Sequence, residues 1–191
     1  MTLAREAWGP SGDPACHLSL RDLRAGLAAL PPDGSDQGTL ALIVIRRADG
    51  ERLTPGEAML DIERGLIGDG WERRPPRELD AQLAVTRRRV AELIAGGQAL
   101  PLGGDNLFVD LDISAGNLPT GTQLAVGEAT VEVSPKPHNG CAKYAERFGA
   151  DALRFVQDSR HRDQNLRGIY WRVTASGRIW TGAPIRISSR P

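Results

Sequence analysis

The sequence predicts a mainly β fold with inserted short helices, an α+β domain whose strands form a barrel-like sheet. Its 191 residues include 22 glycines and 13 prolines, so the chain turns often, which favours short strands over a helical bundle. Short β-branched or alternating apolar runs recur from residue 39 onward. A closed or semi-closed barrel would remove the exposed sheet edges. This length is typical of one domain, with an N-terminal helix and loop over 1–38 and a β-rich core over 39–191.

Three short helices are expected within this order. Ser19 and Asp22 form a capping-box pattern, leucines then recur at helical spacing, and two consecutive prolines end the helix. Apolar residues at helical spacing predict a second helix over 87–95, which the following glycines terminate. A third helix is expected over 141–155, with a break at Gly149.

The strands are predicted from apolar or alternating runs, which cover 39–46, 83–85, 107–113, 124–126, 130–133, 169–175 and 179–187. The residues from Arg52 onward are expected to pair with the first strand in a hairpin. The glycine-rich segment 65–71 is expected to be irregular, and 73–77, with two prolines among three arginines, to form an exposed basic loop.

Charge and composition argue against several classes of partner. The 24 basic and 24 acidic side chains give zero net charge, so we expect no nucleic-acid partner and no attachment to anionic membranes. The longest apolar run, 40–45, is far shorter than the ~20 residues of a membrane span. Residues 1–10 lack the apolar centre of a secretory signal. We therefore expect a cytoplasmic protein in which both cysteines are free thiols.

Cys141 is the strongest candidate for chemistry. It follows Gly140 at the expected start of a helix, where free N–H groups and the helix dipole favour an anion. Lys136, His138 and Lys143 are close in sequence and would favour an anionic sulfur if they are also close in space. Such a sulfur could act as a nucleophile or a metal ligand. The alternative is that Cys141 packs as a small hydrophobic residue.

Other patterns are less specific. Cys16 lies in a polar loop and is interpreted as incidental. A zinc site from Cys16, His17, His138 and Cys141 lacks the usual ligand spacing. A Cys–His hydrolase dyad of Cys141 with His138 would need an unusual geometry across three residues.

Glycine turns and arginine clusters leave two interpretations open. The turns at 65–71 and 103–106 are either ordinary tight turns or the lining of a pocket. The arginines around 73–77 and 160–167 are either solvated surfaces or, if they converge, a pocket for a small anion.

Four segments, taken together, match a known family. In chain order they are Gly65-Leu66-Ile67-Gly68-Asp69, Gly104-Asp105-Asn106-Leu107, Pro137-His138-Asn139-Gly140-Cys141 with its helix, and Arg167-Gly168-Ile169-Tyr170 followed by Gly177 and Thr181-Gly182. Their order and spacing resemble those of MOSC-domain proteins, named for the C-terminal domain of molybdenum cofactor sulfurases. The length resembles that of the small stand-alone bacterial members. Many relatives have Gly-Glu-Asn where this chain has Gly104-Asp105-Asn106.

The resemblance implies a barrel-like domain that binds the molybdenum cofactor. It implies that the sulfur at Cys141 is a ligand to molybdenum or carries a persulfide. Competent relatives reduce N-hydroxylated compounds such as amidoximes and hydroxylaminopurines. We therefore expect a molybdenum-dependent oxidoreductase, the terminal component of a reductase of such small molecules, with electrons supplied by separate electron-transfer proteins.

Two alternatives stay open beside this reading. One is a sulfur carrier that receives a persulfide on Cys141 from a cysteine desulfurase, and the other is a non-catalytic carrier of the cofactor. From motif position and side-chain chemistry, Lys136, His138, Arg77 and Arg167 are expected to surround the pterin phosphate. Asn106 is expected to make a polar contact at the pocket mouth.

Overall fold

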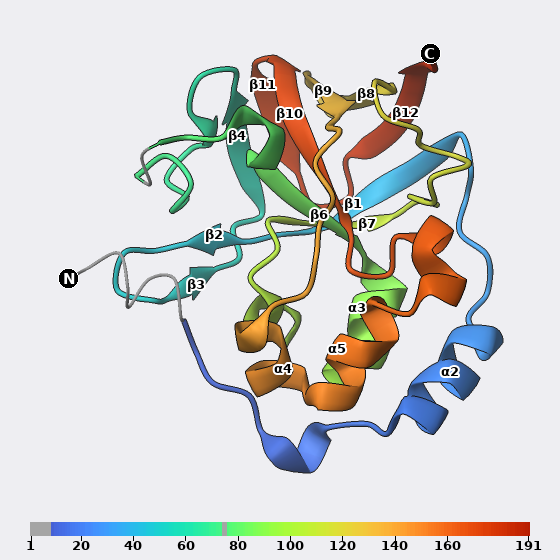
Figure 1. The fold of residues 1–191 in the computed structure, drawn as a ribbon. Coiled ribbons are helices and arrows are strands. Elements are labelled where there is room, and N and C mark those ends of the chain that lie inside the picture. Colours follow the sequence, from blue (N-terminus) through green and yellow to red (C-terminus); the bar gives the residue numbers. More distant parts are fainter. Residues whose placement is uncertain (1–8, 74–75) are drawn as a thin grey trace.

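The structure, a computed structural model, describes residues 9–73 and 76–191 (Figure 1). Residues 1–8 belong to the N-terminal stretch expected to lack a secretory signal, and they lie outside the described residues. So do Arg74 and Pro75, which belong to the segment expected to form an exposed basic loop.

A closed barrel dominates the structure, as the sequence predicts. In the described residues its strands follow the order β1-β12-β8-β9-β10-β6-β7, and β7 pairs back with β1. Their bounds are β1 Gln37–Ile43, β6 Leu83–Arg87, β7 Leu107–Asp110, β8 Gln123–Val126, β9 Ala129–Val133, β10 Ile169–Ala175 and β12 Pro184–Ser189. Neighbours pair antiparallel except β6 and β7, which are parallel. The mainly β fold with inserted helices is therefore confirmed.

The parallel pair explains the position of one predicted helix. Parallel strands cannot be joined by a tight turn and need a crossover. Helix α3 (Arg88–Ala95) supplies that crossover between β6 and β7 and packs its buried Val90 and Ile94 inward. It ends at Gly96, whose φ of 57° is left-handed and suits glycine.

Two small sheets extend from the barrel. One contains β2 (Ile45–Arg46) and β3 (Arg52–Leu53). The other has the strand order β11-β4-β5, and its strands are β4 (Glu57–Asp61), β5 (Gly65–Leu66) and β11 (Gly177–Trp180). The hairpin partner expected from Arg52 is confirmed. The prediction that the glycine-rich segment beginning at Gly65 is wholly irregular is wrong, because Gly65 (φ 70°) turns the chain back to pair β5 with β4.

The remaining α-helices of the described residues lie at one end of the barrel. They are α2 (Leu20–Ala29), α4 (Ala142–Phe148) and α5 (Ala150–Val156), and Figure 1 shows them below the strands together with α3. The predicted cap of α2 is present, since the Asp22 N–H donates to Ser19 Oγ at 3.2 Å. The predicted break at Gly149 (φ 93°) separates α4 from α5, so the third helix expected from the sequence is two short helices.

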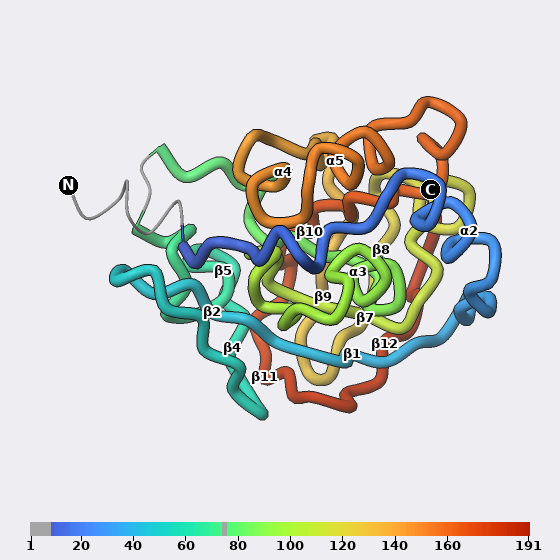
Figure 2. The backbone as a smooth tube through the Cα atoms, turned by 90° about the horizontal axis from the view of Figure 1, so that it is seen from below, coloured from blue at the N-terminus to red at the C-terminus, as the bar shows by residue number. Residues whose placement is uncertain are grey.

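The segment before α2 crosses the helical end of the molecule. Figure 2 shows it passing between α3 on one side and α4 with α5 on the other. A Cβ atom on Gly12 would lie 2.0 Å from the Arg147 carbonyl oxygen, and one on Gly96 would lie 2.2 Å from that of Cys16. Glycine at these positions therefore allows the backbones to pack closely.

Two hydrophobic cores stabilise the fold. The first fills the barrel with inward-facing residues from its strands, with Trp171 as its largest fully buried side chain. The second joins the four α-helices of the described chain, and its members include Leu23, Val90, Ile94, Tyr144, Phe148, Phe155 and Leu166. The site described below lies where these two layers meet.

Asn106 ties the barrel strands together at this end. Its side-chain amide donates to the Val44 carbonyl at 3.3 Å, and its side-chain oxygen accepts from the Ala84 N–H at 3.1 Å. Its backbone N–H and carbonyl also bond to Ala84 and Val44. Asn106 is fully buried, so it bridges the strands and does not lie at a pocket mouth, where the sequence analysis placed it.

We expect Asn106→Ala to destabilise the protein by about 2–4 kcal/mol, because it leaves buried backbone groups of Val44 and Ala84 without one of their partners. Urea unfolding measures the difference. The control is Asn139→Ala, which removes an exposed amide and should change the free energy of unfolding by less than about 0.5 kcal/mol. Equal effects of the two substitutions would contradict the bridging role.

Candidate functional site

The chain between β9 and α4 carries three of the residues selected from the sequence, Lys136, His138 and Cys141. This segment, Ser134–Cys141, is called the proline loop here because two prolines stiffen it. It runs down the outside of the barrel to the helical end (Figure 1). Its start is held by the Ser134 N–H, which donates to the Tyr170 carbonyl of β10 at 2.9 Å.

A buried ion pair lies beneath the proline loop. Arg167 Nη1 donates to Asp105 Oδ1 at 2.7 Å, and both side chains are nearly inaccessible to solvent. Burial would raise the pKa of Asp105, but the Arg167 guanidinium holds it below its usual value. The Arg167 guanidinium also lies over the Tyr144 ring, 4.7 Å from its centroid. The pair therefore connects the turn before β7, the start of β10 and helix α4.

His138 packs against this ion pair and is neutral. Its ring lies 4.3 Å from the Tyr170 ring, and its Nε2 is 3.8 Å from Asp105 Oδ1. Burial, and then the charge of Arg167, lower the pKa of His138 to about 3. At neutral pH His138 is therefore uncharged and cannot be the cation that the sequence analysis expected next to a phosphate. Its buried Nδ1 has no hydrogen-bond partner among the described residues.

A second buried pair joins the two glycine turns noted in the sequence. Arg46 Nε donates to Asp69 Oδ1 at 2.9 Å, and the Arg46 backbone N–H donates to the same oxygen at 2.8 Å. Burial would raise the pKa of Asp69, but Arg46 and the Trp71 N–H lower it. Arg46 Nη1 also donates to the Gly104 carbonyl at 3.2 Å. The turn that contains Asp69 is thus fixed against the turn that carries Asp105.

Further arginines gather around these turns. Arg147 Nη1 donates to the Gly103 carbonyl at 3.2 Å. Arg73 donates to the Gly68 and Arg46 carbonyls. A Cβ on Gly104 (φ 79°) would lie 3.3 Å from Arg147 Nη1 and 3.9 Å from Arg52 Nη2. We call these residues the arginine cluster: Arg46, Arg52, Arg73 and Arg147. From the sequence, Arg73 was expected only as part of a basic loop. The other three were not predicted, because they are spread over three segments of the chain.

Cys141 lies at the start of α4 and is exposed. Its carbonyl accepts from the N–H groups of Tyr144 and Ala145, which begins the helix. Arg147 is close enough to the thiol for their charges to interact. Burial lowers the pKa of Arg147, whereas a negative charge on Cys141 raises it. The exposure rules out the alternative that Cys141 packs as a small buried hydrophobic residue. Cys16, the other free cysteine, is half-buried.

A cavity of about 430 Å³ is bordered by the proline loop. Lys136, His138 and Arg167 line it, so the structure brings three of the expected residues together. The last lining residue before α4 is Gly140, and Cys141 is not one of the described residues that line the cavity. Cys141 is therefore next in sequence to a lining residue without itself lining the cavity.

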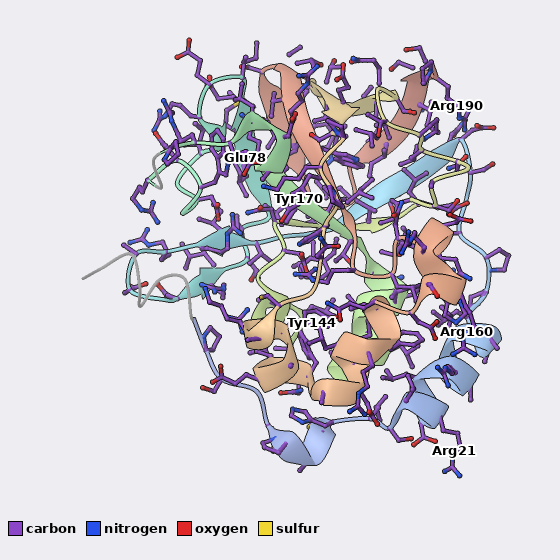
Figure 3. The ribbon with its side chains drawn as sticks, in the orientation of Figure 1. Arg21, Glu78, Tyr144, Arg160, Tyr170 and Arg190 are labelled. Carbon is purple, nitrogen blue, oxygen red and sulfur yellow. The ribbon has the colours of Figure 1, made fainter. Side chains whose placement is uncertain are left out.

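Arg77 is not brought to this cavity. Its Nη1 donates to the Glu63 carbonyl at 3.2 Å, and its guanidinium lies 5.9 Å from the centroid of the Trp71 ring. The Arg77 side chain is exposed, and its partner Glu63 lies in the turn between β4 and β5. Lys136 forms an ion pair with Glu78, which Figure 3 labels near β4.

The zinc and hydrolase alternatives find no support in the geometry. Within residues 9–73 and 76–191, no group of three or more His, Cys, Asp and Glu side chains is placed to hold a metal ion. Over the same ranges, no hydrogen bond joins His138 to Cys141. Among the described helices, none has the length and apolar character required to cross a bilayer.

A model of the MOSC domain matches residues 81–186, more than half of the chain. The chain belongs to the MOSC-domain family. The match contains the proline loop, the buried Asp105–Arg167 pair and Cys141. The MOSC domain is associated with binding of the molybdenum cofactor.

Solved structures share the fold of this MOSC protein. The YuaD protein of Bacillus subtilis has a TM-score of 0.60 at 16% identity, over 81% of this chain and 97% of that one. YiiM from Escherichia coli has a TM-score of 0.53 at 24% identity, over 80% and 71% of the two chains. YiiM from Geobacillus stearothermophilus has a TM-score of 0.54 at 17% identity, over 80% and 76%. A comparison with curated proteins gives no match.

The buried, neutral His138 makes stability depend on pH. Its pKa is about 3 in the folded protein, against an ordinary value of 6.5. Between pH 6.5 and 3 the unfolded chain therefore binds a proton at this histidine, whereas the folded chain does not. The free energy of unfolding decreases by about 1.4 kcal/mol for each pH unit as the pH falls through this range. In His138→Gln this slope should be absent. Urea unfolding at pH 8, 6 and 4.5 compares the two proteins.

A direct readout complements the unfolding data. The His138 imidazole resonances in NMR spectra should not change between pH 8 and 4.5. Titration of these resonances near pH 6.5, or stability curves of wild type and variant that run parallel, would contradict the assignment of His138 as buried and neutral.

Proposed function

We propose that this MOSC protein binds the molybdenum cofactor through Cys141 and is the terminal component of a reductase of small N-hydroxylated compounds. The observation that carries the proposal is the exposed thiol at the start of α4, within electrostatic range of Arg147. A thiolate is a soft ligand, suited to a metal such as molybdenum. The family membership supports the same cofactor.

The residues near Cys141 fit an anionic cofactor. The arginine cluster places guanidinium groups around the Gly103–Gly104 turn, and guanidinium groups pair with phosphate oxygens through two parallel hydrogen bonds. Because Gly104 has no side chain, the Arg147 guanidinium can lie close against this turn. We propose that Arg147 and Arg52 hold the pterin phosphate, in place of Arg77, whose guanidinium contacts the Glu63 carbonyl and the Trp71 ring.

When bound, the cofactor supplies the metal that accepts the oxygen atom in a two-electron reduction of the N–O bond. The protein's own residues position it. Cys141 supplies a sulfur ligand from a fixed helix start, and the buried Asp105–Arg167 pair holds the loop that leads to it. Tyr170 is partly buried, which raises the pKa of its phenol, so it stays protonated and can donate a hydrogen bond. Electrons would come from separate electron-transfer proteins.

The exposure of Cys141 also favours a second candidate function. An accessible thiol can receive sulfur as a persulfide from a cysteine desulfurase and pass it to an acceptor. Intact-mass spectrometry after incubation with a desulfurase and cysteine tests this. An added mass of one sulfur on wild type, lost in Cys141→Ser, supports the carrier role, and no adduct contradicts it.

We expect wild-type protein from a host that makes the cofactor to contain molybdenum, and Cys141→Ser to lose about nine-tenths of it, because one strong ligand bond is missing. Metal analysis of the purified proteins measures the content. Cys16→Ser is the matched control, since it removes the other free thiol, and it should retain the wild-type content. Equal molybdenum in all three proteins would contradict the ligand role, and none in wild type would contradict cofactor binding.

A further inference from the structure

The cavity bordered by the proline loop is not lined by the thiol of Cys141. Its walls are the proline loop, the end of α5, the 3₁₀ helix Ser159–Gln164 and the segment that enters β10. None of the four residues of the arginine cluster is among the described residues that line it, and neither is Cys141. The cofactor binding proposed above therefore leaves this cavity without a role.

Its lining carries more positive than negative charge. Lys136, Arg162 and Arg167 are the cations among the described lining residues, and Asp158 is the carboxylate. Asp158 is already paired with Arg24 at 3.0 Å and with Arg160 at 2.6 Å. It therefore does not neutralise the cations of the cavity.

Arg162 differs from the other two cations. Lys136 is paired with Glu78, and Arg167 with Asp105. Over residues 9–73 and 76–191, the exposed Arg162 guanidinium has no hydrogen-bond or ion-pair partner. It lies on the cavity wall with all its donors available to a ligand.

The wall that carries Arg162 is held firmly. The Asp158 side chain caps the 3₁₀ helix by accepting from the Arg160 N–H, and Asn165 ends it at φ 49°. The Asn165 side chain donates to the Ile113 carbonyl at 2.8 Å, which fixes this turn to the barrel. A binding group on a rigid support loses less entropy when a ligand binds.

The rest of the lining is mixed. Apolar side chains come from Leu118, Pro119, Val156, Leu166 and Ile169, and polar ones from Thr120, Ser134, Asn139, Gln157 and Asn165. A volume of about 430 Å³ is within the range typical of small-molecule sites. The cavity thus combines polar and apolar lining residues with an unpaired guanidinium.

We propose that this cavity binds a small organic oxyanion, a carboxylate or phosphate monoester with an apolar body, and that Arg162 is its anchor. The site is distinct from the site at Cys141 and does not depend on the molybdenum cofactor. Arg162 donates to the oxyanion, and the apolar residues of the lining contact the body of the ligand.

Isothermal titration calorimetry at low ionic strength tests the proposal with three probes that share a ring: phenyl phosphate, benzoate and the neutral benzyl alcohol. One or both anions should bind wild type, and benzyl alcohol should not. Comparison of the two anions identifies whether phosphate or carboxylate is preferred. Arg162→Gln should weaken binding about tenfold, the loss expected for one charge-assisted hydrogen bond.

Two variants serve as controls. Arg154→Gln makes the same change of charge on the neighbouring helix α5, at an exposed arginine paired with Asp151 and outside the described lining. It should bind the probe within about twofold of wild type, because Arg154 does not line the cavity and its charge is already paired with Asp151. Cys141→Ser should also bind normally, which separates this site from the proposed cofactor site.

Four results would overturn the proposal. The first is that neither anion binds wild type, and the second is that benzyl alcohol binds as tightly as the anions. The third is that Arg154→Gln and Arg162→Gln weaken anion binding equally, and the fourth is that Arg162→Gln loses molybdenum. The last result would assign the cavity to the cofactor itself.

Discussion

The buried ion pair between Asp105 and Arg167 is the constraint on which the functional end of this MOSC protein depends. Burying two charges costs desolvation free energy, which their mutual attraction offsets. Removing one partner leaves the other charge buried and uncompensated, which destabilises the fold. The pair therefore fixes the distance between the turn before β7 and the start of β10. Tyr144 packs on the Arg167 guanidinium and His138 packs beside Asp105, so α4 and the proline loop are held by the same contact. Figure 3 places Tyr144 in the helical layer and Tyr170 in the barrel above it.

Two candidate binding regions follow from this arrangement. One is the exposed Cys141 with the arginine cluster, in which Arg46 and Arg147 donate to carbonyl groups of the Gly103–Gly104 turn. The other is the cavity, in which Arg162 is the unpaired cation among the described lining residues. Zero net charge conceals this segregation, because the acids Asp69, Asp105 and Asp158 are each used by particular arginines. Local charge, and not the total, determines which ligands such a surface can hold.

The sequence predicted the elements with strong local signals and missed those that depend on distant contacts. The cap at Ser19, the crossover helix and the break at Gly149 follow from spacing and backbone preferences. The pairing of β5 with β4 was missed because it depends on a tertiary pairing. At the site, motif order identified Cys141 and the loop before it. Arg46 and Arg147 were missed because their roles arise only when separate turns meet, and His138 was misjudged as a cation because burial cannot be seen in a sequence.

The most direct test of this account is a double-mutant cycle on the buried pair. The free energy of unfolding is measured for wild type, Asp105→Asn, Arg167→Gln and the double variant. We predict that each single substitution destabilises the protein strongly and that the double variant is far less destabilised than their sum, with a coupling energy of about 2–3 kcal/mol. Additive effects, within about 0.5 kcal/mol, would show that the two charges do not depend on each other and would contradict the central role given to this pair.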